Sequence, residues 1–319
     1  MKTDGETNNF QYGHGLQICE EISKNYDWLV SYSLSNNDDK LCLEDNKNRC
    51  CRFCGKSFPD VSFREKAHII PEFMGNKKLF SKYECDDCNH YFSKFETEFA
   101  EFMLLHNSLS GTRSKKNKIP KYKKIGQPIM ENTPELTNIT NVHNMDINNI
   151  EKKGLNIPFN RSYIPEYIYR CLVKIAISII PENKLDSYKD TISWLMDLKK
   201  ESNVPPSMIF SNYPFSYKME EIFCTILERK ESCTENFPFS IFFLSYNNFG
   251  FQIYIPNTSK EFLGKEINGV PFYVPMSLDL NPTYFESRVN IYTDLSLRQK
   301  KTDVVIFNFS SEHYKIIDN

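Results

Sequence analysis

No apolar run in the sequence is long enough to cross a membrane. A membrane-spanning helix needs about 20 consecutive apolar residues, and the best candidate, Ile175 to Ile180, is a fragment of an amphipathic pattern. The first 15 residues are polar and lack the apolar segment of a secretory signal. Internal repeats of 20 to 50 residues are absent as well. We therefore expect no membrane partner and a cytoplasmic location.

The sequence also lacks a strong overall charge. Its 39 Lys and Arg residues nearly balance 41 Asp and Glu residues, which gives a net charge of −2. A protein that uses its whole surface to bind nucleic acid is basic throughout. Residues 51–124, however, hold 15 basic against 9 acidic residues, a net charge of +6, and the remainder carries −8. Contact with a polyanion is therefore expected in this segment, and the acidic remainder favours a protein or a small ligand as its partner.

The length of 319 residues favours two domains over one. We expect a tail and a helix over 1–48, a metal-bearing module over 49–124, a linker over 125–161 and a separate α+β domain over 162–319. Within the first segment, the apolar spacing of Leu16 to Leu34 predicts a helix. The polar stretch Asn36 to Asn48 predicts a linker.

The last segment combines helices with an antiparallel sheet. Apolar residues recur at helical spacing from Ile164 to Ile179, before Pro181, and a second helix is expected over Leu185 to Lys200. Aromatic and β-branched runs follow, and Asn247-Asn248 predicts a hairpin turn between two of them. The expected strands are Met208–Tyr213, Glu221–Leu227, Ser240–Tyr246, Phe249–Ile255, Val270–Val274 and Val304–Phe309. The expected fold class is α+β.

Four of the ten cysteines form two C-x-x-C pairs, Cys51/Cys54 and Cys85/Cys88, with 30 residues between the pairs. Such paired knuckles are the ligand pattern of a Cys₄ zinc site. Cys50 can replace Cys51 in register, although the C-x-x-C spacing favours Cys51. Thiolates fill all four tetrahedral positions and leave none for a water molecule. The expected zinc is therefore structural, and any chemistry must come from other residues.

The residues between and after the two pairs form a recognisable pattern. Ala67-His68-Ile69-Ile70-Pro71 lies between them, and Asn89 follows the second pair. The combination C-x-x-C, HIIP and EC-x-x-CN-x-x-F resembles the HNH (ββα-metal) endonucleases, and most closely a bacterial subset. The resemblance covers about residues 51–124, less than a quarter of the chain.

This resemblance implies a small zinc-stapled ββα-metal nuclease module. In the family, the catalytic His lies on a β-hairpin and the last Asn lies at the start of a helix, and the two face each other across a divalent ion. It also implies DNA as the substrate, in a role such as bacterial restriction or anti-phage defence.

The residue types suit phosphodiester hydrolysis, which needs a base for the attacking water and a cation for the charge on the phosphate. A neutral imidazole supplies a base near pH 7, so we expect His68 to be the general base. An amide oxygen suits Mg²⁺ or Mn²⁺, so we expect Asn89 to be a ligand of the catalytic ion.

The second protein ligand of this ion stays open. Many HNH members carry an acidic residue or His immediately before the catalytic His, where this chain has Ala67. The middle Asn of the pattern is not evident between Phe80 and Tyr83. Glu65 on the hairpin and Glu96 on the helix, which shares a helical face with Asn89, are the candidates. For each of the two carboxylates, the residue type alone favours a solvated or capping group over a metal ligand.

A helix and a basic stretch complete the module. The helix carries a stripe of large apolar residues that predicts a core-facing side: Phe92, Phe95, Phe99, Phe102 and Met103. After it comes a stretch that no acidic residue interrupts: Arg113, Lys115, Lys116, Lys118, Lys121, Lys123 and Lys124. Lysines this dense predict phosphate contacts that are sequence-independent and sensitive to salt, or else a solvated loop.

Three functions are therefore open. The first is a metal-dependent DNA endonuclease whose last domain recognises a target, a trigger or a partner subunit, with oligomers allowed. The second is a catalytically silent zinc knuckle that binds nucleic acid or protein, which the missing acidic residue before His68 favours. The third is a nuclease that acts on RNA.

Overall fold

The structure is a computed structural model of the chain. It describes residues 20, 22–43, 50–114, 117–133, 136–141, 155–200, 207–213, 218–257, 260, 288–292 and 298–307. Within these ranges, no helix combines the length and the apolar character that a membrane span requires.

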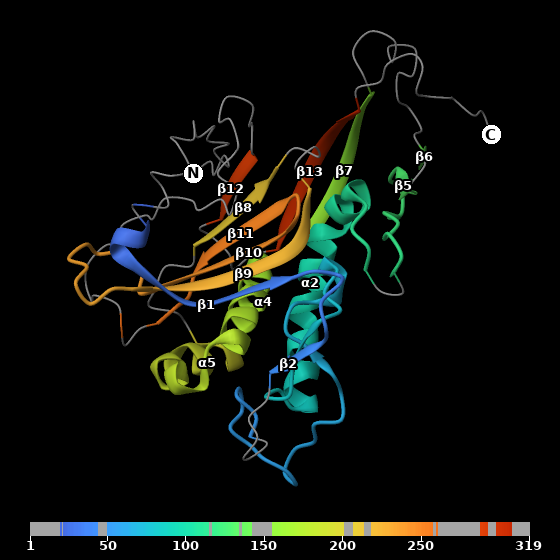
Figure 1. The fold of residues 1–319 in the computed structure, drawn as a ribbon. Coiled ribbons are helices and arrows are strands. Elements are labelled where there is room, and N and C mark those ends of the chain that lie inside the picture. The colour runs from blue at the N-terminus through green and yellow to red at the C-terminus, as the bar shows by residue number, and fades with distance from the viewer. Residues whose placement is uncertain are drawn as a thin grey trace.

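A six-stranded antiparallel sheet forms one layer of the molecule (Figure 1). Its spatial order is β1-β9-β10-β11-β8-β12. The strands are β1 (Tyr26–Leu34), β8 (Met208–Asn212), β9 (Met219–Arg229), β10 (Ser240–Asn247), β11 (Phe249–Tyr254) and β12 (Arg288–Tyr292). Every residue of β10 and β11 is buried, so both faces of the sheet are covered at its centre.

The hairpin between β10 and β11 confirms the turn that the sequence predicts. Tyr246 pairs with Phe249, and Asn247 has a left-handed φ of 53°. Asparagine adopts this conformation more readily than most residues, because its short polar side chain can bond locally.

The helices of the carboxy-terminal half also follow the predicted pattern. They are α4 (Pro165–Ile179), the 3-10 helix η4 (Glu182–Tyr188) and α5 (Lys189–Met196). Proline at the first position of α4 costs no hydrogen bond there. Buried residues lie on all sides of α4, because it is enclosed between the sheet and a helix of the module.

The module has a ββα arrangement, as expected. It contains β2 (Leu41–Leu43), β3 (Ala67–His68), the 3-10 helix η1 (Glu72–Met74), β4 (Leu79–Ser81) and α2 (Asp86–Ser110). β3 pairs antiparallel with β4, and β2 pairs with the other edge of β4 in parallel. Two ribbons accompany it, namely β5 (Ile129–Asn132) with β6 (Thr137–Thr140), and β7 (Leu155–Tyr163) with β13 (Gln299–Phe307).

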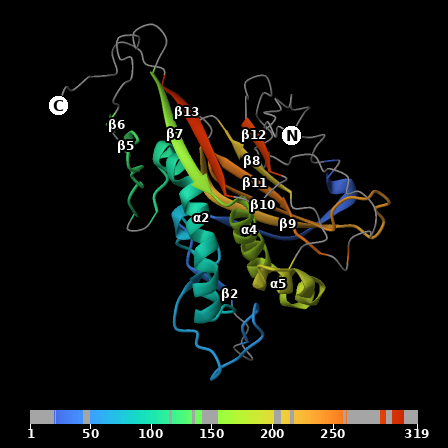
Figure 2. The ribbon, with the colours of Figure 1, turned by 180° about the vertical axis from the view of Figure 1, so that it is seen from behind.

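One hydrophobic core joins the module to the sheet. The apolar stripe of α2 is buried as predicted. At one end of the stripe, Phe92 contacts Phe53 of the first knuckle, with ring centroids 4.6 Å apart. Farther along α2, Phe99 contacts Phe251 of β11 at 5.0 Å. Figure 2 shows α2 and α4 together on one face of the sheet, so the module is packed against the rest of the chain.

Two predictions for the amino-terminal part are wrong. Helical residues at 22–25 give way to β1, which pairs with β9, so Leu16 to Leu34 is not one helix. The polar stretch Asn36 to Asn48 contains β2, which pairs with β4. In both cases a pairing distant in the sequence decides the structure. The predicted strand Val270–Val274 lies outside the described residues.

Candidate functional site

Four cysteine sulfurs converge at the amino-terminal end of α2. The Sγ atoms of Cys51, Cys54, Cys85 and Cys88 all lie within 4.8 Å of one another. Those of Cys54 and Cys85 are 3.8 Å apart. Four sulfurs bound about 2.3 Å from a tetrahedral zinc ion are separated by about 3.8 Å. The cluster can therefore hold a metal such as zinc, as the two C-x-x-C pairs predict.

Each cysteine pair lies at a backbone turn. The N–H of Gly55 donates to the carbonyl of Cys51 at 2.8 Å, and Gly55 has a φ of 70°, which glycine adopts without strain. Cys85 is the N-cap of α2, and Cys88 lies in its first turn. The free N–H groups at a helix start favour negative charge, so this position stabilises thiolates.

The four thiols cannot ionise together without a cation. A hydrogen bond with the Cys88 thiol lowers the pKa of Cys51 to about 5, and the same bond raises the pKa of Cys88 far above its usual value. Burial raises the pKa of Cys85 to about 12. The opposed shifts come mainly from the hydrogen bond between the Cys51 and Cys88 thiols and from burial, with repulsion between the sulfurs as a smaller cause. The donor set therefore fits a Cys₄ zinc site.

His68 lies on β3 of the hairpin, and its ring packs on Phe80 of β4 with centroids 4.7 Å apart. Its Nδ1 atom is buried, and the backbone of Asn76 lies beside the ring. Burial lowers the pKa of His68 below 6.5, although the carboxylates of Glu72 and Glu96 oppose the shift. The ring is therefore neutral at pH 7, the form that a general base requires.

Asn76 braces the loop between the two hairpin strands. Its side-chain NH₂ donates to the carbonyls of Ile70 and Leu79 at 2.7 and 3.0 Å. Its Oδ1 accepts the N–H groups of Lys78 and Leu79, both at 2.9 Å. The residue is 1% exposed. The family pattern places its middle Asn close to the second knuckle. Asn76 lies farther upstream, directly after Gly75, so the sequence analysis did not predict a role for it.

The predicted ligand Asn89 contacts the predicted candidate Glu65. The Asn89 Nδ2 atom donates to Oε2 of Glu65 at 2.6 Å. Asn89 lies in the first turn of α2, and Glu65 lies on the segment before β3. The contact brings an amide and a carboxylate together, and both groups offer the oxygen ligands that Mg²⁺ takes.

Asp86, the first residue of α2, holds the Glu65 segment in place. Its carboxylate accepts hydrogen bonds from the Ser62 hydroxyl at 2.5 Å and from the N–H groups of Arg64 and Glu65, each at 2.9 Å. Slight burial raises the pKa of Asp86, but these bonds outweigh it and the pKa lies below its usual value. Asp86 was not singled out from the sequence, although an Asp opening a helix is a recognisable signal.

A buried lysine of α4 reaches the hairpin. Lys174 is 1% exposed, and its Nζ atom donates to the His68 carbonyl at 3.0 Å. The same atom lies 3.0 Å from a Glu84 carboxylate oxygen and 3.5 Å from one of Glu96. Burial opposes the charge of Lys174, but the two carboxylates outweigh it and raise the pKa above its usual range. Lys174 thus ties β3, the second knuckle and α2 together.

The first knuckle is anchored to the other end of α4. Arg52 donates to the carbonyls of Ile177, Ser178 and Ile180 at 2.8 to 3.0 Å, and its guanidinium lies over the Tyr83 ring at 4.2 Å. These carbonyls have no partners inside the helix at its carboxy-terminal end. A cation here also complements the helix dipole.

The other positions considered for the second metal ligand take no part in the hydrogen bond between Asn89 and Glu65. Ala67, at the position where many HNH members carry a ligand, is 1% exposed and offers no donor atom. Glu96 is ion-paired with Lys174 on the His68 side. Glu65 is therefore the candidate carboxylate that the described contacts join to Asn89.

The basic stretch after α2 is partly paired. Lys121 binds Glu131 at 2.7 Å, and Lys124 binds Glu101 at 2.6 Å. Lys118 and Lys123 are exposed and have no ion pair within the described part of the chain. Lys115 and Lys116 lie outside the described residues.

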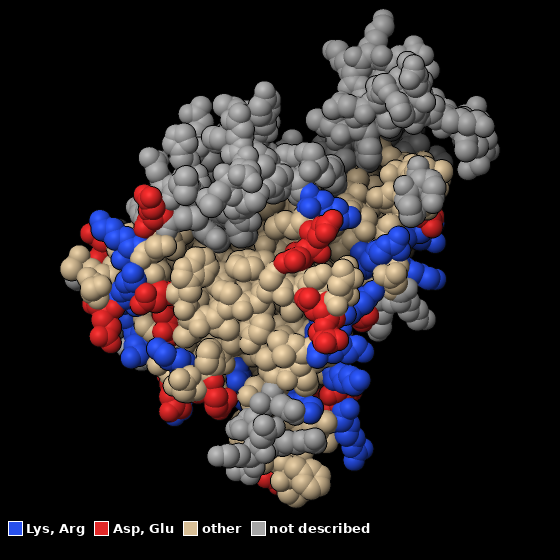
Figure 3. Space-filling model, in the orientation of Figure 1, with Lys and Arg blue, Asp and Glu red and all other residues tan. Residues whose placement is uncertain are grey.

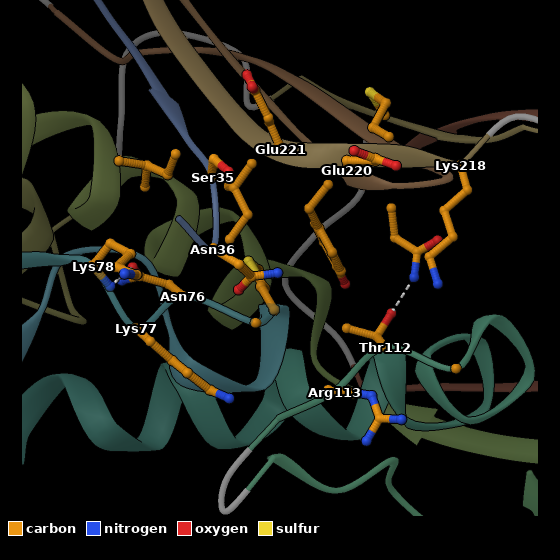
Figure 4. Close-up of a pocket in the computed structure, with 18 of the residues that line it drawn as sticks. Ser35, Asn36, Asn76, Lys77, Lys78, Thr112, Arg113, Lys218, Glu220 and Glu221 are labelled. Atoms are coloured by element: carbon orange, nitrogen blue, oxygen red, sulfur yellow. Dashed lines mark hydrogen bonds between the residues drawn. The ribbon is translucent and has the colours of Figure 1, made fainter. Parts of the chain in front are cut away.

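Arg113 lines a cavity of about 550 Å³ between the module and the sheet (Figure 4). Lys77, Lys78 and Lys218 also line it, and the walls include the carboxylates of Glu220 and Glu221. Positively and negatively charged residues therefore both line this cavity.

Residues 51–105 match the HNH endonuclease family. The matched segment begins at the first knuckle and ends within α2, so it contains both cysteine pairs, the hairpin and Asn89. Comparisons with curated proteins and with solved structures each found no significant match.

Proposed function

We propose that this chain, which carries an HNH endonuclease segment at 51–105, is a metal-dependent endonuclease that hydrolyses phosphodiester bonds of DNA. The observation that carries the proposal is the contact between Glu65 and Asn89 beside a Cys₄ cluster, on a module whose hairpin presents a neutral His68. The Cys₄ cluster joins the first knuckle to the start of α2 and takes no part in the chemistry.

Glu65 and Asn89 would hold the catalytic ion through their side-chain oxygens. The side-chain oxygens of Glu65 and Asn89 suit Mg²⁺ or Mn²⁺ and leave room for the water molecules that such ions keep. When bound, the ion neutralises charge on the phosphate and on the leaving oxygen. The Asn89 amide donates to Glu65 in the structure, so its oxygen has to turn towards the ion.

The hairpin supplies the base. Because Nδ1 is buried, Nε2 is the nitrogen that would take the proton from an attacking water. Lys174 and Asn76 hold the backbone of the hairpin, so the ring keeps its position during proton transfer. The proposed biological setting is bacterial restriction or anti-phage defence, which the sequence pattern implies.

Nicking of supercoiled plasmid tests the proposal. The purified chain should nick the plasmid with Mg²⁺ or Mn²⁺ and stop when EDTA is added. His68→Ala should lower the rate by about 10²- to 10⁴-fold, the usual contribution of a general base. His90→Ala, an exposed His on the same module, is the matched control and should cut normally. RNA oligonucleotides in parallel reactions decide between DNA and RNA as the substrate.

The alternative is a catalytically silent zinc module that binds nucleic acid or protein. Ala67 favours this alternative. Because alanine offers no ligand atom at this position, only Glu65 and Asn89 remain as protein oxygen donors for a catalytic ion. If wild-type protein and His68→Ala bind DNA equally and neither cuts with any divalent ion, the alternative is correct.

A further inference from the structure

A small basic cavity lies beside the β7–β13 ribbon, outside the segment that matches the HNH family. Its volume is about 310 Å³. The residues that line it are all polar or basic: Lys124, Gln127, Asn160, Arg161, Ser162, Lys300, Lys301 and Thr302. Four of the eight are cationic and none is acidic. The cavity of Figure 4, by contrast, includes two glutamates in its wall.

The ribbon sets the position of the cations. Lys300 pairs with Ser162 and Lys301 with Arg161 in the antiparallel register. Arg161 is 4% exposed and donates to the Phe102 carbonyl of α2 at 2.9 Å. Arg161 is therefore a buried member of the lining, whereas Lys300 and Lys301 are exposed.

The opposite wall comes from the loop after α2. Gln127 is fixed against β7, because its Oε1 accepts the N–H of Asn160 at 2.7 Å and its Nε2 donates to the Asn160 carbonyl at 3.3 Å. Lys124 belongs to the same loop and is held by Glu101 of α2. The basic stretch after α2 and the lysines of β13 therefore meet at one place, although they are far apart in the sequence.

Figure 3 shows Lys and Arg gathered along the edge of the molecule where α2 and β5 lie. Exposed Lys118 and Lys123 belong to the same loop as Lys124. Lysines arranged along a surface suit a row of phosphates, because each acts as a point charge and reads no base.

We infer that this basic cavity binds a backbone phosphate of the nucleic acid that the chain acts on, which rests on the proposed function. Glu101, which holds Lys124, follows Asn89 by 12 residues of α2, about 18 Å at the helical rise. The cavity therefore contacts the nucleic acid outside the segment that matches the HNH family, and the contact is independent of base sequence.

Duplex binding by the full chain tests this inference. Binding of a fluorescent 30-base-pair duplex to zinc-loaded protein is measured without added Mg²⁺ or Mn²⁺ and without a chelator, over a range of salt concentrations, for wild type and for Lys300→Gln/Lys301→Gln. The double variant should bind more weakly, and the slope of log K against log salt should become shallower by about 0.9 for each phosphate that is no longer neutralised. Lys199→Gln/Lys200→Gln changes two adjacent exposed lysines after α5 and is the charge-matched control.

Equal affinities and slopes for the two double variants would overturn the inference. Lys300→Glu/Lys301→Glu, checked for wild-type thermal unfolding, is the second variant and should weaken binding further. Inorganic phosphate is titrated as well. Phosphate binding that depends on Lys300 and Lys301, with duplex affinity unchanged, would mean a small-anion site instead. Because no Mg²⁺ or Mn²⁺ is added, metal-dependent cutting does not occur and the binding measurements do not depend on whether the chain is a nuclease.

Discussion

Asp86 is the residue on which the Glu65–Asn89 contact depends. Its carboxylate collects three hydrogen bonds from the segment that carries Glu65. We predict that Asp86→Ala frees this segment and lowers Mg²⁺-dependent cutting by about 10- to 100-fold, as loss of a group that orients a metal ligand usually does. Asp87→Ala, at the exposed neighbour in the same knuckle, is the control. The effect is measured as plasmid nicking against Mg²⁺ concentration, and equal curves for the two variants would contradict it.

The environment of His68 predicts the pH at which the cutting rate falls on the acid side of its pH profile. Burial and the Lys174 charge hold its pKa below 6.5, and Glu72 opposes them. Cutting should therefore persist below pH 6.5 and be lost only as the ring protonates. Glu72→Gln removes a carboxylate that favours the protonated ring, so the acid limb should move to lower pH. Glu231→Gln, at an exposed site in the turn after β9, should leave the pH–rate profile unchanged.

At the scale of elements, α4 stabilises the module through one buried charge. Lys174→Met removes the cation and leaves the Glu84 carboxylate buried. Breaking a buried ion pair in this way costs about 3 to 5 kcal/mol of stability. Urea unfolding in the presence of zinc should show this loss, and adding Glu84→Gln should recover part of it. Lys189→Met changes a largely exposed lysine and should stay within about 0.5 kcal/mol of wild type.

Local patterns in the sequence predicted elements whose cause is local. The Asn247-Asn248 turn, the α2 stripe and the helix that ends before Pro181 all depend on residues a few positions apart. The strand β1 could not be predicted in the same way. Its apolar spacing also fits a helix, and it becomes a strand because Ser31 pairs with Thr225, almost 200 residues away.

The site was predictable to a similar degree. Fixed spacing predicted the four cysteines, which the structure brings together. His68 and Asn89 stay predictions, to which the structure adds a contact between Asn89 and Glu65. The roles of Asn76, Asp86 and Lys174 come from hydrogen bonds between separate segments, which spacing does not encode. The cluster of Lys124 with Lys300 and Lys301 likewise depends on how β13 pairs with β7.

At the scale of the whole molecule, the metal cluster and the sheet belong to one core. Phe53 of the first knuckle, Phe92 and Phe99 of α2 and Phe251 of β11 lie in the same hydrophobic cluster. Removal of zinc should therefore destabilise the whole chain, because metal binding contributes folding free energy. We expect a chelator to lower the midpoint of a single thermal transition seen both by far-ultraviolet circular dichroism and by Trp194 fluorescence. Two separated transitions, with only the first sensitive to the chelator, would contradict a shared core.

The bond from Lys174 to His68 also has a consequence for the order in which the protein is made. The two residues are 106 positions apart, and His68 leaves the ribosome first. A nascent chain that ends before α4 has its cysteine knuckles and its imidazole but no lysine beneath the hairpin. The Lys174 brace is therefore available only after the hairpin that it holds has been translated.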